Sequence, residues 1–222
     1  MQPNNRDSEA GFSLIELIVA MTVMLLLMGV VSVLLSKAMS VRTRESQTSD
    51  ALASCESALN VMSREISNSG FGLHDSADAS KGTNGIIMGA GESDDHRIHF
   101  RANLTNSQAY SPGMDPGDTT DPGEEITYFH DAATRSIVRY DPHGNPQTAV
   151  VVNGISNVTF KYWNYSGTGI ISSSATPTSE TARVEITVDV DLDPVPGQPN
   201  NRKVQYRSQV NLRNAQYMLH QY

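Results

Sequence analysis

The chain has 222 residues, of which 38% are hydrophobic and 18% charged, and its formal net charge at pH 7 is −8. This composition indicates one folded domain, or a domain with an anchor, and the acidic balance argues against nucleic-acid binding, because nucleic-acid-binding proteins usually carry a basic excess. The single cysteine, Cys55, excludes an intrachain disulfide framework and any multi-cysteine metal site.

A long apolar segment lies near the N-terminus, at residues 12–35. Its residues 17–35 carry no formally charged side chain and would form a helix about 28 Å long, close to the roughly 30 Å of a hydrocarbon core. The run is longer than the apolar stretch of a secretory signal peptide, although residues 36–38 would serve as a cleavage tripeptide and keep that reading open. A plain single-pass anchor is the other alternative, but it leaves a buried carboxylate unexplained.

That carboxylate is Glu16, which lies inside the apolar block. An ionised carboxylate is costly in lipid unless it is paired, and no basic residue follows Glu16 within two helical turns. A cut between Gly11 and Phe12 would free an ammonium group on Phe12, four residues before Glu16 and on the same helical face. The ion pair would form within one chain or between neighbouring chains of an assembly.

The string GFSLIEL at residues 11–17 resembles the class III signal of type IV prepilins and type II secretion pseudopilins. The resemblance implies that a prepilin peptidase cuts between Gly11 and Phe12, that Phe12 is then N-methylated, and that Glu16 aids addition of the subunit to a filament. It also implies a cytoplasmic leader at residues 1–11, a single-pass precursor in the bacterial inner membrane, and a periplasmic head. The mature subunit would then move into a pilus or pseudopilus.

Two features depart from this family pattern. The leader ends with the acidic residues Asp7 and Glu9, where the family normally has basic residues. Three basic residues, Lys37, Arg42 and Arg44, follow the apolar span and only Arg6 precedes it, so the positive-inside rule predicts the opposite topology. The motif is the more specific signal, so we predict the membrane topology that the motif implies.

The helix is predicted to continue past the membrane, from residue 13 to residue 69. Apolar residues spaced three and four apart form a single stripe there, and Gly70 and Gly72 supply stop signals. We therefore expect a transmembrane or filament-core helix at 12–36 and an amphipathic continuation at 37–69. The stripe consists of Leu52, Cys55, Leu59, Met62 and Ile66, so Cys55 is interpreted as a small buried side chain rather than a nucleophile.

The remainder, residues 70–222, is predicted to be a β-rich head. Alternating apolar and polar residues indicate strands, and the segment 126–140 reads as a hairpin. The predicted fold class is α+β, with one antiparallel sheet of about five to seven strands covered by the stripe of the helix, as in pilins. The expected strands are 97–102, 126–130, 136–140, 158–163, 183–192 and 204–212, the last two facing each other across a turn.

The order of the strand motifs is similar to that of W-type minor pilins (PilW) and the J-type pseudopilins of type II secretion. The motifs are a tyrosine strand followed by VRY at 138–140, a V-x-NGISNVTFKY segment at 151–162, and a closing QVNLRN at 209–214. This resemblance implies a structural subunit, not an enzyme, that primes or caps a type IV pilus used in adhesion, motility or DNA uptake. The alternatives are a type II secretion pseudopilin and a membrane-anchored envelope binding domain with a pilin-like anchor.

The resemblance also implies the partners. These are the prepilin peptidase, other major and minor pilins or pseudopilins, and a tip adhesin. No direct nucleic-acid contact is expected, because residues 76–134 hold ten acidic and three basic residues. The chain has no proline between residues 12 and 69, where major pilins often carry one, and bulky acidic heads would repel one another if repeated along a filament. These features favour a position at or near the tip.

The acidic segment 115–125 is the main candidate for a ligand site in the head. Its oxygen ligands would suit calcium, but their spacing is not that of an EF-hand, and Pro116 and Pro122 stiffen the loop. We expect a solvated loop and no cofactor, with calcium as the minor alternative. His96 and His99 are expected on opposite faces of a strand, which argues against a metal pair. The carboxylates of the segment are those of Asp115, Asp118, Asp121, Glu124 and Glu125.

Overall fold

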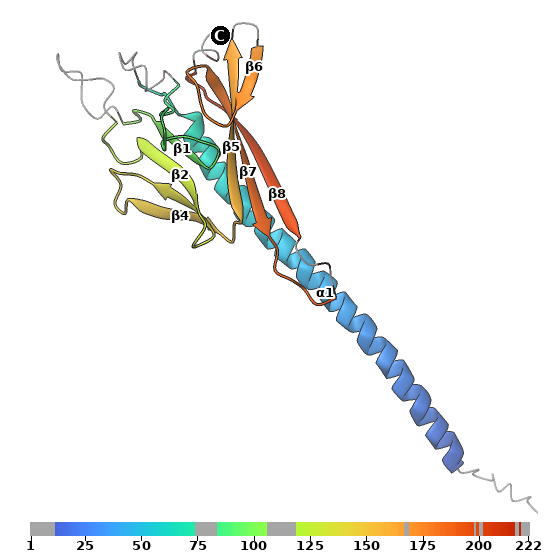
Figure 1. The fold of residues 1–222 in the computed structure, drawn as a ribbon. Helices are drawn as coiled ribbons and strands as arrows, with labels where there is room; N and C mark the ends of the chain where they lie inside the picture. Colours follow the sequence, from blue (N-terminus) through green and yellow to red (C-terminus); the bar gives the residue numbers. More distant parts are fainter. Residues whose placement is uncertain are drawn as a thin grey trace, which may run out of the picture. The chain divides into compact units, whose positions relative to one another are not determined.

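The computed structural model describes residues 12–73, 84–105, 119–166, 169–197, 199, 202–215 and 218. The chain divides into two compact units, one of residues 1–46 with 194–200 and one of residues 47–193 with 201–222. The elements follow in the order α1 (Leu14–Ser67), β1 (Arg97–Arg101), β2 (Glu125–Asp131), β3 (Ser136–Tyr140), β4 (Thr148–Asn153), β5 (Asn157–Ser166), β6 (Gly169–Ser174), β7 (Thr181–Asp191) and β8 (Lys203–Asn211) (Figure 1).

The helix α1 confirms the prediction of one long N-terminal helix, and it ends two residues earlier than expected. After Ser67 the chain turns tightly, as the N–H of Ser69 donates to the carbonyl of Ile66 at 3.0 Å. Gly70 then has a φ of 81°, a backbone conformation that glycine adopts without strain. The helix therefore ends beside the glycine that was predicted as its stop signal.

The second unit buries one face of α1. Four residues of the predicted stripe are buried, and Ala58 joins them. Leu52 is 44% exposed, so its assignment to the buried stripe was wrong. Cys55 is the first buried residue of the helix, and Ala51, one turn earlier, is partly buried against the core. The buried set is Cys55, Ala58, Leu59, Met62 and Ile66.

The first sheet has the antiparallel order β1-β2-β3-β4. The predicted hairpin is confirmed, because β2 pairs with β3 from Thr127 opposite Tyr140 to Asp131 opposite Ser136. Alternate residues of β2 and β3 turn toward the helix, so Tyr128 and its cross-strand partner Arg139 share the face that meets α1.

The second sheet has the antiparallel order β6-β5-β7-β8. The predicted pairing of the two late strands is confirmed, with Val184 opposite Val210 and Val190 opposite Val204. Inward residues of β5 and β7, including Phe160 and Ile186, are fully buried. The core thus lies between the second half of α1 and the inner faces of both sheets.

The prediction of a single sheet was wrong, and two strands were missed. β4 reads TAVVVN, without the alternation that marks a half-buried strand, and β6 reads GIISSS, which is poor in strand-forming residues. The break between the sheets falls at residues 154–156. The N–H of Ile155 donates to Arg135 of the first sheet's hairpin and the N–H of Ser156 donates to Asp189 of β7, so two adjacent residues serve different sheets.

Candidate functional site

The predicted assembly residue Glu16 lies in the first turn of α1, and the predicted processing residue Phe12 lies just before the helix begins. The backbone N–H of Ser13 donates to Glu16 Oε2 at 3.2 Å, and the N–H of Leu17 donates to the Ser13 carbonyl at 3.2 Å. Ser13 is thus the residue before the first helical turn, and Glu16 reaches back to it as the acidic member of a capping box does. The sequence pattern S-x-x-E was the signal for this bond, and our sequence reasoning missed it.

This bond places the Glu16 carboxylate next to the predicted cleavage point. Ser13 is the residue after Phe12, and Phe12 is 90% exposed. An ammonium group on Phe12 would therefore arise one peptide unit from the hydrogen-bonded Glu16 oxygen, and it would add to the positive end of the helix dipole. Gly11 lies outside the described residues. Cleavage and methylation stay predictions.

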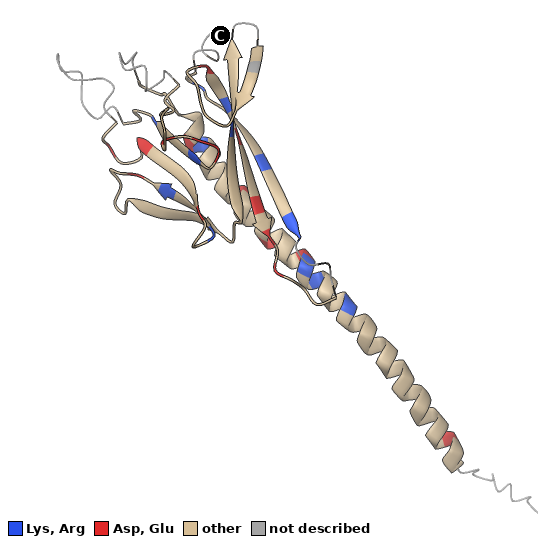
Figure 2. Cartoon of the chain, viewed as in Figure 1, with Lys and Arg blue, Asp and Glu red and all other residues tan. Residues whose placement is uncertain are grey.

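The first part of α1 is apolar all round and exposed. Its large hydrophobic side chains from Leu14 to Leu35 are 49–76% exposed, and the uncharged stretch of the helix is tan in Figure 2. The hydroxyl of Thr22 donates to the carbonyls of Ile18 and Val19, so this polar group is satisfied within the helix. Such satisfaction is what a lipid environment requires.

Among the described residues, α1 is long and apolar enough to cross a membrane, with none of its most apolar 18-residue window buried. A helix that is hydrophobic all round and not covered by its own chain needs an apolar surrounding, in lipid or in an assembly. The same part of the chain matches a known family model. Residues 6–32 carry the prokaryotic N-terminal methylation motif.

The match supports a type IV pilin-like or pseudopilin protein, and the arrangement of a long apolar helix with antiparallel sheets agrees with it. The matched range includes Gly11, Phe12 and Glu16. Comparisons with curated proteins and with solved structures give no match. The methylation motif therefore points to prepilin peptidase as the processing enzyme and to other pilins as partners in assembly.

A polar network ties α1 to the first sheet. Glu65 on α1 accepts a hydrogen bond from the hydroxyl of Tyr128 and one from Arg139 Nε at 3.0 Å. Arg139 also lies 3.4 Å from Asp141, whose Oδ2 accepts the N–H of Gly123 at 2.7 Å. Burial lowers the pKa of Arg139, but hydrogen bonding to Glu65 outweighs it and the pKa is raised. The guanidinium is thus held charged between two carboxylates.

His99 of β1 hydrogen-bonds one carboxylate in the loop before β1 and one at the start of β2. Its Nδ1 lies 2.6 Å from Glu92 Oε2 and its Nε2 lies 3.1 Å from Glu125 Oε1. Burial lowers the pKa of His99, but the hydrogen bonds to Glu125 and Glu92 outweigh it, so the pKa is raised. Both ring nitrogens face carboxylates, which only the doubly protonated imidazolium satisfies. His96 precedes β1, so the expectation that both histidines share a strand was wrong.

Part of the predicted calcium segment is described, and its carboxylates bind the protein itself. Glu124 is 2% exposed, and its Oε1 accepts the N–H groups of Leu104 and Thr105 at 2.8 and 2.9 Å. The hydroxyl of Thr105 donates to Asp121 at 2.7 Å. Asp115 and Asp118 lie outside the described residues. Over the part of the chain that the structure describes, no three metal-ligating side chains gather.

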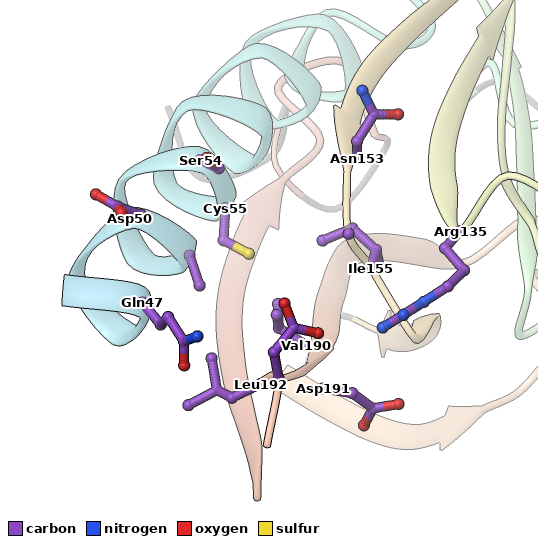
Figure 3. A pocket seen from close by; sticks show the side chains of 13 residues that line it. Gln47, Asp50, Ser54, Cys55, Arg135, Asn153, Ile155, Val190, Asp191 and Leu192 are labelled. Atoms are coloured by element: carbon purple, nitrogen blue, oxygen red, sulfur yellow. The ribbon is translucent and has the colours of Figure 1, made fainter. Parts of the chain in front are cut away.

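A groove of about 370 Å³ lies in the second unit beside α1 (Figure 3). Cys55 points from α1 toward this groove, which Ile155, Val190 and Leu192 line on the sheet side. Burial raises the pKa of the Cys55 thiol to about 11, so the neutral thiol dominates at physiological pH and is a poor nucleophile. The groove has mixed charge, with Arg135 among its lining residues, and it offers no catalytic arrangement that we recognise.

Proposed function

We propose that the chain is a minor pilin or pseudopilin, a structural subunit that primes or caps assembly of a type IV pilus. The observation that carries the proposal is the methylation motif at residues 6–32, followed directly by the exposed apolar part of α1. The precursor is held in the bacterial inner membrane by α1 with its head in the periplasm. Prepilin peptidase cuts after Gly11, and Phe12 becomes the methylated N-terminus.

Assembly rather than a reaction is the mechanism. Apolar helices leave lipid and pack against those of neighbouring subunits, which keeps their exposed side chains in an apolar surrounding. Glu16 and the new ammonium on Phe12 set the register between chains, because a wrong register leaves a carboxylate unpaired in an apolar interior. The bond from Ser13 to Glu16 supports this role, since it holds the carboxylate at the end of the helix where the ammonium forms.

The processing step is tested by replacing Gly11. In cells that contain the peptidase, Gly11→Leu should keep the precursor mass, whereas the unchanged chain should begin at Phe12 and carry one added methyl group. The check is intact-mass analysis and N-terminal sequencing of the full chain from membranes. A Gly11→Leu protein that still begins at Phe12 would show that the assignment of the cleavage site is wrong.

The subunit sits at or near the filament tip, where it meets other minor pilins or an adhesin. The support is the acidic excess of residues 76–134 and the lack of a proline between residues 12 and 69. Quantitative mass spectrometry of purified filaments should find few copies, and deletion of the gene should reduce the number of filaments. A copy number near that of the most abundant pilin would overturn the tip position. A type II secretion pseudopilin is the second candidate, since the motif serves both assemblies.

A further inference from the structure

The two sheets of the head have four edge strands, β1, β4, β6 and β8, and bonds from other described segments of the chain cover one of them, β1. At β1, the N–H of Arg101 donates to Gly85 and the N–H of Ile87 donates to His99, each at 2.9 Å. Gly70 adds a third bond from its N–H to the Arg101 carbonyl at 2.9 Å. These bonds use the hydrogen-bonding groups that an edge strand would otherwise present to another chain.

Two of the other edges have features that oppose pairing. β8 carries Lys203 and Arg207, and basic side chains on an edge strand discourage pairing with another chain. β6 is built from one glycine, two isoleucines and three serines, and glycine is depleted in strands. In β6, Ser172 and Ser174 lie near the side-chain amide of Asn164 within their own sheet.

β4 differs from these three edges. It shares the lack of charge with β6, since no Asp, Glu, Lys or Arg lies in residues 144–160, but it alone of the four carries three successive valines. Val150 is 55% exposed. Within the described residues, no backbone hydrogen bond joins the outer side of β4 to another segment. A strand of this composition with free backbone groups readily pairs with another strand.

The outer face of the first sheet carries an apolar row that reaches this edge. Phe129 of β2 lies opposite Val138 of β3, and Val138 lies opposite Val150 of β4, so the three share one face. Arg139, the next residue of β3, turns to α1 instead. A strand added beside β4 would place its own apolar side chains next to Val150 and extend the row.

We propose that β4 is a strand-addition site, at which an extended, uncharged segment of a neighbouring, non-identical pilin-like subunit continues the first sheet. The backbone groups on the outer side of β4, which bond no other segment that the structure describes, provide hydrogen bonds, and the row that ends at Val150 selects apolar side chains. This inference rests on the proposed function, because that function supplies neighbouring subunits of the same class.

A second copy of the chain is a poorer occupant. An antiparallel β4–β4 ladder needs a two-fold axis normal to the sheet, and the sheet lies against residues 55–66 of α1. Such an axis turns the α1 segments of the two copies in opposite directions, whereas subunits added to one filament point the same way. A filament therefore needs a contact between two different surfaces.

Photo-crosslinking in the native cells tests the proposal with a matched control. A photoreactive amino acid replaces Val150 in the full chain, and in a second variant it replaces Ile170 of β6, which is also 55% exposed. We expect an adduct from position 150 to an extended segment of a different chain that carries its own prepilin-type N-terminus. No adduct at 150, adducts only at 170, an adduct to a second copy, or an adduct within the same chain would each overturn the proposal.

Charge substitution at the same two positions provides a second measurement. The second measurement is the amount of the partner, identified by crosslinking, that co-purifies with the chain. Val150→Lys should reduce this amount by about tenfold, while Ile170→Lys should leave it within about twofold. Unfolding followed by Trp163 fluorescence shows that both variants are folded, since Trp163 is the single tryptophan. Equal recovery for Val150→Lys and the unchanged chain would overturn the proposal. A mature N-terminus other than Phe12 would instead contradict the proposed function, so the two failures are distinguishable.

Discussion

Arg139 of β3 donates through Nε to the carboxylate of Glu65 on α1 at 3.0 Å, and this ion pair joins the helix to the first sheet. Both side chains are about one-fifth exposed, at 21% and 22%. The hydroxyl of Tyr128 donates to the same carboxylate oxygen, and burial, followed by the nearby charge of Glu65, raises the pKa of Tyr128. One carboxylate thus satisfies two donors, the hydroxyl of the buried Tyr128 and the guanidinium of the partly buried Arg139.

Replacing Glu65 should therefore cost more than the loss of one surface ion pair. We expect Glu65→Ala to lower the free energy of unfolding of the head by about 2–4 kcal/mol, because it leaves Arg139 and Tyr128 without their shared acceptor. Urea unfolding of the detergent-solubilised full chain, followed by Trp163 fluorescence, measures this. The control Glu56→Ala, on an exposed position of α1, should change the free energy by less than about 0.5 kcal/mol.

The raised pKa of His99 predicts a pH dependence of stability with a definite sign. A histidine whose pKa is higher in the folded state stabilises the fold fully below its unfolded pKa of about 6.5, and this contribution is lost as pH rises through the folded value. The head should therefore lose stability as pH rises from about 6.5 into the alkaline range. His99→Gln should remove most of this dependence.

The measurement is the free energy of unfolding at a series of pH values, with His96→Gln as the control, since the His96 side chain is 60% exposed. Glu125 has the opposite effect on the pH dependence of stability. Its hydrogen bond with His99 lowers its pKa, so its contribution to stability is lost as pH falls. A pH profile of His99→Gln that matches that of the unchanged chain above pH 6.5 would contradict the assigned role.

Gly85 and Gly154 have nearly the same positive φ, so alanine substitutions at the two positions distinguish the cost of backbone strain from the cost of a steric clash. Gly85 has a φ of 77°, and an added Cβ would lie 2.0 Å from the Gly70 nitrogen, whereas Gly154 has a φ of 79° and nothing within 4 Å. We expect Gly154→Ala to destabilise by about 1–2 kcal/mol through strain alone, and Gly85→Ala by more than about 3 kcal/mol. Urea unfolding measures both, and equal losses would argue against close approach at Gly85.

The sequence predicts those parts of the fold that local patterns determine. The uncharged run after Glu16, the stripe of α1 and the hairpin over 126–140 follow from spacing. The division into two sheets does not, because it depends on Ile155 and Ser156 finding partners that lie far away in the chain. The Glu65 network was missed for a similar reason, since a charged residue beside an apolar stripe reads as exposed until the strand register places Arg139 opposite Tyr128.

Calcium should have little effect on the head, although the acidic segment resembles a ligand loop. Glu124 already accepts backbone N–H groups from Leu104 and Thr105, and Glu125 bonds His99, so these carboxylates are engaged by the protein. We expect the melting temperature of the full chain to agree within about 1 °C in millimolar calcium and in chelator. A rise of several degrees with calcium would show a bound ion, because a ligand that binds the native state stabilises it.

Glu16 has two roles that two substitutions can separate. Its Oε2 accepts the N–H of Ser13, which stabilises the first turn of α1, and its charge is the proposed partner of the Phe12 ammonium. Glu16→Gln keeps an oxygen that can accept the hydrogen bond but removes the charge, whereas Glu16→Ala removes both. If the charge sets the register between chains, both variants should be processed at Gly11 and both should enter filaments at less than about one-tenth of the normal level, since an unpaired ammonium in an apolar interior costs more than the roughly 1.4 kcal/mol of a tenfold change.

Quantitative mass spectrometry of purified filaments, normalised to the amount of processed subunit in the membrane, measures the incorporation of each variant. The matched control is Ser13→Ala, which keeps the backbone N–H and the Glu16 carboxylate and removes only the serine hydroxyl. It should enter filaments at close to the normal level. Normal incorporation of Glu16→Gln together with poor incorporation of Glu16→Ala would show that closing the first helical turn is sufficient and that no ion pair sets the register.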